Sequence, residues 1–172
     1  MNNWIYKVFL LTFLLSILFT SITNLIAHNT NQLVIFFMII FVIVIAIVFD
    51  MISTSALTSD EASFHAMNSK KIKGAKEAIY LIRNNVKVVS ICSDVIGDIL
   101  GIASGGLGAV LAINLSQTTD FNVAITGIII AAFISAFTVG GKAIFREIAI
   151  KNNAKIIFRF GKIFRIFKKK LK

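Results

Sequence analysis

Long apolar runs constrain this chain more than any other feature of its sequence. The run at 33–49 holds seventeen apolar residues without interruption, and three other runs are of similar length. An α-helix rises 1.5 Å per residue, so ~20 apolar residues cross the ~30 Å hydrocarbon core of a bilayer. Hydrophobic residues make up 57% of the 172 residues, more than a soluble fold of this length can bury. We therefore expect an all-α, polytopic helical membrane protein.

The apolar runs predict four transmembrane helices within a single membrane domain, at about 6–27, 33–50, 88–113 and 122–141. We expect that domain to cover 1–172, with no soluble domain. The first run could be mistaken for a signal peptide. One basic residue precedes it and its core is long for a signal peptide, which favours a retained anchor helix.

Two further segments are amphipathic. An interfacial helix is predicted at about 64–85, because apolar residues recur there at helical spacing opposite several lysines. The basic tail at 151–172 is predicted to carry an apolar stripe of Ile156, Phe160, Ile163, Phe164, Phe167 and Leu171. The opposite stripe holds Arg159, Lys162, Arg165 and Lys169. We expect this tail to bind anionic lipids, at about 1 kcal/mol per well-placed basic residue.

The distribution of basic residues predicts the topology. The formal net charge is +10, and seventeen of the eighteen Lys and Arg residues lie in the link 50–87 and in the segment from Lys142 onward. The links 28–32 and 114–122 contain neither. Positive segments stay on the cytoplasmic side, so we expect a multi-pass cell-membrane protein with both termini cytoplasmic. This layout accounts for the positive net charge, so we do not expect nucleic acid as a partner.

Enzyme and zinc chemistry are not expected. Cys92 is the single cysteine, and His28 and His65 have no companions at metal-ligand spacing. The sequence contains no phosphate-binding glycine loop and no nucleophile with a base at motif spacing. We therefore predict that the protein is not an enzyme and has no resident cofactor.

Two carboxylates inside the third run are the strongest functional candidates. Asp94 and Asp98 lie one helical turn apart, so they share a helix face. A carboxylate at the bilayer centre costs about 2.5–3.5 kcal/mol, so the pair predicts an interior polar site. Mg²⁺ prefers carboxylate and other oxygen ligands. The alternative is a packing role, in which the carboxylates bond serines, Lys142 or the backbone.

Small residues suggest where helices approach one another. Gly97, Gly101 and Gly105 form a small-xxx-small pattern, typical of contact within a protomer or across a dimer. Gly140 and Gly141 end the fourth run. They predict either an unwound segment that offers carbonyl oxygens to an ion or a simple helix stop.

Four blocks of sequence resemble one known family. They are FDMISTSALTS at 49–59, KGAKEAIYLI at 73–82, ICSDVIG at 91–97 and TVGGK at 138–142. In order and spacing they are similar to the F-S-x-S-E-T-A-L-T-S, G-x-x-A, I-G-N-N-L-V-N and E-I-x-P-K blocks of the transmembrane domain of CNNM/CorC magnesium transporters. The resemblance covers about 33–165 and implies that fold, a homodimer and transport or exchange of a divalent cation.

The resemblance also implies a set of oxygen ligands for the transported Mg²⁺. Asp94 and Ser93 fall at the family's paired asparagines, and Ser53 and Ser55 at its hydroxyl positions. Asp98 matches no family position and would be a replacement charge. Thr54 and Thr138 stand where the family has acidic residues, and Gly141 stands where it has proline. The resemblance does not extend to the family's cytosolic regulatory domains.

The sequence leaves two rival functions open. The two acidic positions replaced by threonine favour a non-transporting membrane scaffold or regulatory subunit that keeps the fold without the ion site. Small size, several spans and a cationic tail are also found in membrane-permeabilising proteins of the holin type, although two intramembrane acids argue against that function.

Overall fold

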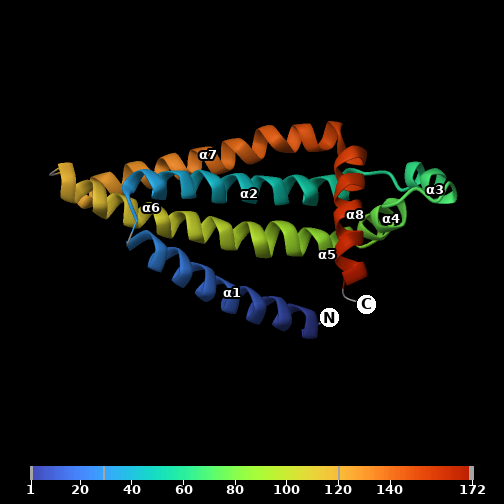
Figure 1. The fold of residues 1–172 in the computed structure, drawn as a ribbon, viewed down its shortest axis with the longest axis horizontal. Helices are drawn as coiled ribbons and strands as arrows, with labels where there is room; N and C mark the ends of the chain where they lie inside the picture. The colour runs from blue at the N-terminus through green and yellow to red at the C-terminus, as the bar shows by residue number, and fades with distance from the viewer. Residues whose placement is uncertain (1, 29, 120, 171–172) are drawn as a thin grey trace. The chain divides into compact units, whose positions relative to one another are not determined.

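The computed structural model describes residues 2–28, 30–119 and 121–170, with backbone alone for 2–5, 28 and 167–170. Within that part of the chain every regular element is a helix (Figure 1). In order these are α1 (Asn2–His28), α2 (Gln32–Thr58), α3 (Ala62–Ser69), α4 (Ala75–Arg83), α5 (Asn85–Val89), the π-helix η1 (Ser90–Gly97), α6 (Asp98–Thr119), α7 (Val123–Lys151) and α8 (Asn153–Lys170). The predicted all-α class is confirmed.

Four helical segments are long and apolar enough to cross a membrane: Tyr6–Ala27, Gln32–Thr58, Asn85–Thr119 and Val123–Lys151. Their number agrees with the prediction, but three of them continue beyond the predicted ends. Asp50 lies inside α2 rather than at its end, because backbone hydrogen bonding continues past a polar side chain. Gly140 and Gly141 lie inside α7, so the predictions of an unwound segment and of a helix stop are both wrong.

The chain divides into two compact units, each built from two segments. The first unit is Met1–Ile47 with Val95–Gly141, and the second is Val48–Asp94 with Lys142–Lys172. Three elements, α2, η1 and α7, contribute residues to both units. The polar clusters described below lie in the second unit.

The core of the first unit joins α2 to α6. Ile35, Ile39 and Ile43 recur every fourth residue on α2 and pack with Leu107 and Leu111 of α6. A polar contact lies near this core, where the Gln32 side-chain amide donates a hydrogen bond of 3.0 Å to the Asn114 carbonyl. Helix α1 packs along α6 in the same unit.

The second unit is centred on the packing of α4 against α8, which lie side by side (Figure 1). The apolar face predicted for 64–85 is buried there at Phe64, Ala75, Ile79 and Ile82. Ile157 of α8 joins the same core. The start of α8 is fixed by a bond of 2.7 Å that the Asn153 amide donates to the Thr58 carbonyl at the end of α2.

The prediction of one continuous interfacial helix at 64–85 is wrong, because the segment forms two helices, α3 and α4. A turn separates α3 from α4, and two of its residues have positive φ, Lys71 at 53° and Gly74 at 100°. Positive φ is incompatible with a continuing right-handed helix and is easiest for glycine. Spacing of apolar residues carries no signal of such a turn.

Helices α4 and α8 approach closely at Gly161. A Cβ atom at this position would lie 2.9 Å from the Gly74 carbonyl oxygen and 3.0 Å from the Ala78 nitrogen. Both neighbours are backbone atoms of α4 or its cap, so they cannot move aside as a flexible side chain would. Glycine at 161 therefore sets the distance between the two helices.

We expect Gly161→Ala to destabilise the packing of α4 against α8 by about 1–3 kcal/mol, the usual cost of overpacking. Thermal unfolding of the detergent-solubilised full chain measures the change. The matched control is Gly140→Ala, because a Cβ there would meet no heavy atom within 4 Å. Equal unfolding midpoints for the two variants would show that the close approach is not needed.

Candidate functional site

The candidate site is a buried carboxylate on α2. Asp50 follows the longest apolar run and is only 4% exposed. Among the residues that the structure describes, Asp50 is the one acidic residue that is buried. Asp94 and Asp98 are exposed. A charged group removed from water needs hydrogen bonds and an opposite charge.

Two side chains from distant elements supply those partners. The Ser93 hydroxyl, on η1, donates a hydrogen bond of 3.1 Å to Asp50 Oδ1. Arg146 Nη2, on α7, lies 3.3 Å from both Asp50 Oδ1 and Oδ2. We name these three residues the Asp50 cluster; all belong to the second unit.

The two charged members of the Asp50 cluster differ in exposure. The Asp50 side chain is 5% exposed and the Arg146 side chain 55%. Arg146 therefore keeps part of its hydration while it neutralises the buried carboxylate. Loss of the arginine would leave Asp50 with the Ser93 hydroxyl and no opposite charge.

The backbone around Ser93 has a local irregularity. Residues Ser90–Gly97 form a π-helix between α5 and α6. Each hydrogen bond of a π-helix reaches one residue further than in an α-helix, and such segments occur often at functional sites. Within η1, Ser93 bonds Asp50 and the next residue, Asp94, is exposed.

The structure distributes the predicted magnesium ligands among different environments. Ser53 and Ser55 are buried in the second unit, and Ser55 Oγ has no hydrogen-bond partner there. Ser93 is the predicted ligand that joins the Asp50 cluster. Asp94 and Asp98 are both exposed in the described chain, and their role as ion ligands stays a prediction.

The described residues contain no group of three or more His, Cys, Asp or Glu side chains that could hold a metal ion. Sequence reasoning missed Asp50 and Arg146. Asp50 directly follows the apolar run 33–49 and stands at the predicted end of that span, a position that carries no signal of its burial. Arg146 is separated from it by 96 residues and carries no local signal.

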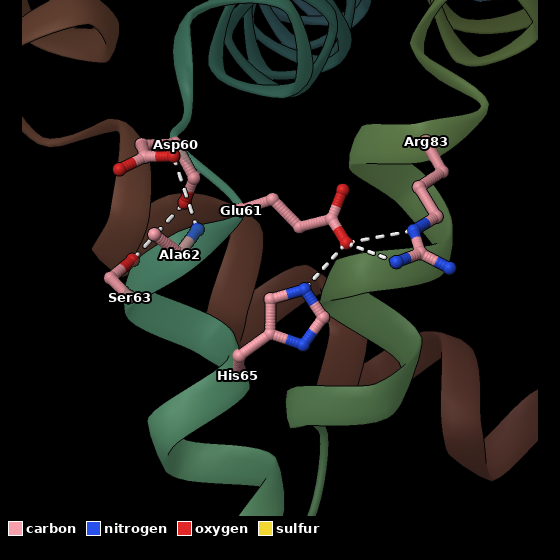
Figure 2. Close-up of polar contacts among 6 residues, drawn as sticks. All are labelled: Asp60, Glu61, Ala62, Ser63, His65 and Arg83. Carbon is pink, nitrogen blue, oxygen red and sulfur yellow. Dashed lines mark hydrogen bonds and ion pairs between the residues drawn. The ribbon is translucent and has the colours of Figure 1, made fainter.

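A second polar cluster lies where α3 meets α4. Figure 2 shows Glu61 reaching toward His65 and Arg83. Glu61 Oε1 accepts a hydrogen bond of 2.7 Å from Arg83 Nε and lies 2.7 Å from His65 Nε2. Next to it, the Asp60 carboxylate accepts a bond of 3.1 Å from the Ala62 backbone N–H, at the start of α3.

The ion pair between Glu61 and Arg83 shifts the pKa of both residues. Hydrogen bonding to the Arg83 guanidinium holds the pKa of Glu61 below its usual 4.5. The same bond raises the pKa of Arg83. A carboxyl group with a lowered pKa in the folded chain stabilises the fold at neutral pH and loses that contribution in acid.

No protein-family model, curated protein sequence or solved structure matches this chain. The resemblance to the CNNM/CorC transmembrane domain therefore stays a prediction from the four sequence blocks. Membrane insertion is supported by the four long apolar helices themselves.

We expect the attachment of α3 to α4 to weaken in acid. The Glu61 contribution is complete above pH 4.5, the ordinary pKa, and is lost as the pH falls through the lower pKa of the folded chain. Amide hydrogen exchange of Ala62–Ser69, corrected for intrinsic pH dependence, measures the loss. Glu61→Gln should remove the acid-induced step, and an identical step in that variant would assign it to another carboxyl group.

We expect Arg146→Ala to be the most damaging change in the Asp50 cluster. It leaves a buried carboxylate without its opposite charge, which costs about 3–5 kcal/mol for a fully buried pair and less here because Arg146 is half exposed. Asp50→Asn should cost less, since the amide oxygen still accepts from Ser93 and Arg146 can turn to water. Thermal unfolding in detergent compares them.

The double variant Asp50→Asn with Arg146→Ala is the internal control. It removes both charges together, so it should be more stable than Arg146→Ala alone. A double variant that is no more stable than the single one would mean that the ion pair does not explain the loss.

Proposed function

We propose that this chain is a non-transporting membrane scaffold or regulatory subunit with a fold like that of the CNNM/CorC transmembrane domain. The observation that carries the proposal is the pairing of Asp50 with Arg146. A cation-binding site needs oxygen atoms that are free to replace water around the ion. Here the Arg146 guanidinium lies against both oxygens of the buried Asp50 carboxylate. Its positive charge would repel a divalent cation.

The positions of the predicted ligands support the same function. In the second unit, Ser53 and Ser55 are buried while Asp94 is exposed. Asp98 is exposed in the first unit. This difference in exposure between Asp94 and the two serines supports a function without a shared coordination shell.

Open helix surfaces suit a protein that assembles with other membrane proteins. A Cβ at Gly101 or Gly105 of α6 would meet no heavy atom within 4 Å. The most apolar stretch of α7 has no residue that is buried by the rest of the described chain. Small residues let helix backbones approach in a bilayer, so these surfaces fit lipid or a further transmembrane helix. The homodimer implied by the family resemblance stays a prediction.

Divalent cation transport, with Mg²⁺ as the passing ion, is the second candidate. Ser55 Oγ favours it, because this buried hydroxyl has no hydrogen-bond partner and could offer an oxygen to an ion. Under either function, the charge distribution supports a multi-pass cell-membrane protein with cytoplasmic termini.

Magnesium flux into proteoliposomes tests the proposal. We expect vesicles that contain the full chain to take up Mg²⁺, reported by an encapsulated indicator dye, at the rate of empty vesicles. An added ionophore shows that the indicator responds. Millimolar Mg²⁺ should also leave the thermal unfolding midpoint unchanged, because a ligand that binds only the folded state raises it.

Protein-dependent flux that is lost in Asp94→Asn would overturn the proposal in favour of transport. The matched control for that variant is Glu147→Gln, which alters a carboxylate whose side chain is 70% exposed and paired with Lys151. Leakage of an uncharged dye from the same vesicles would instead indicate a membrane-permeabilising protein.

A further inference from the structure

Helix α8 presents a row of cations on its outward face. Lys155, Arg159 and Lys162 are spaced four and three residues apart, so they share one side of the helix, and all three are exposed. Two apolar side chains lie beside them, Ile163 at 49% and Ile166 at 67% exposure. We name the five residues the α8 outer face.

The other side of α8 is already occupied. Ile157 is fully buried and Gly161 lies against the Gly74 carbonyl. Phe164 stacks on Tyr80 of α4, with ring centroids 6.2 Å apart. The packing of α8 on α4 thus determines which side chains of α8 remain available.

This packing changes what the sequence predicted for the tail. Ile156 and Phe160 of the predicted apolar stripe pack against the core of the second unit, and Ile163 is the stripe member that stays exposed. The side chains of Phe167, Lys169 and Leu171 lie outside the described residues. Three of the four stripe members whose side chains are described therefore pack within the protein, so we expect attachment to depend mainly on charge.

We propose that the α8 outer face binds the headgroups of anionic phospholipids. Helix α8 begins at Asn153, two residues after α7 ends at Lys151, so the face belongs to a segment adjoining a candidate span. No Asp or Glu occurs from Asn153 to Lys170, so no acidic side chain of the helix offsets its positive charge. The exposed isoleucines beside the cations suit an amphiphile better than a soluble polyanion.

Selective retention of lipid tests the proposal. The full chain is purified in mixed micelles of phosphatidylglycerol and phosphatidylcholine, and the retained lipids are counted by mass spectrometry. We expect the wild type to enrich phosphatidylglycerol. Lys155→Gln with Arg159→Gln and Lys162→Gln should reduce that enrichment at least fivefold, about the effect of one well-placed cation. Glutamine keeps the methylene group by which Lys162 packs near Gly74.

The matched control removes three charges elsewhere. Lys70→Gln with Lys71→Gln and Lys73→Gln changes three exposed residues of the α3–α4 turn and should keep the enrichment. Equal loss in both triple variants would mean that net charge alone attracts the lipid, and would overturn the assignment to α8. No preference in the wild type would also overturn it and would leave the cations to an acidic soluble partner.

Salt provides an independent measurement on the wild-type protein. The Debye length falls from about 10 Å at 0.1 M to about 3 Å at 1 M, so the enrichment should fall steeply over that range. Enrichment that persists at 1 M salt would contradict attachment by charge. The assay does not depend on ion flux, so its result is separate from that of the proposed scaffold function.

Discussion

Neutralisation of Asp50 is the constraint on which the second unit depends. A carboxylate in an apolar helix of this kind costs about 2.5–3.5 kcal/mol at the bilayer centre unless other groups compensate it. Ser93 from η1 and Arg146 from α7 supply that compensation. One buried charge therefore joins parts of three long helices and fixes their register in the second unit. The same arginine lies 3.3 Å from both carboxylate oxygens of Asp50, and the proposed scaffold function depends on this contact.

Close backbone packing complements the ion pair. Gly161 lets α8 approach the start of α4, and Gly74 takes a positive φ that a side chain would strain. Neither glycine is needed for helix formation, and glycine in a helix interior costs about 1 kcal/mol relative to alanine. The cost is offset by the contact that it permits, which buries Ile157 and the apolar face of α4.

Features that depend on local periodicity could be predicted from the sequence, and features that depend on distant contacts could not. Apolar runs predicted the four long helices, and helical spacing predicted the buried positions Ile79 and Ile82. Spacing also placed Asp94 and Asp98 on a common face, but it cannot say whether that face points inward. The partner of Asp50 lies 96 residues away, so only the fold brings it into contact.

The same reasoning explains why an amphipathic helix need not contact a membrane through its apolar side. Sequence alone assigns the apolar stripe of α8 to the bilayer, because no other apolar surface is visible in one dimension. In the structure, however, Ile156, Phe160 and Phe164 of the stripe pack against the second unit. The exposed side of α8 holds Lys155, Arg159 and Lys162 beside Ile163 and Ile166. Screening by salt is therefore the property that would separate adsorption by charge from insertion of apolar side chains.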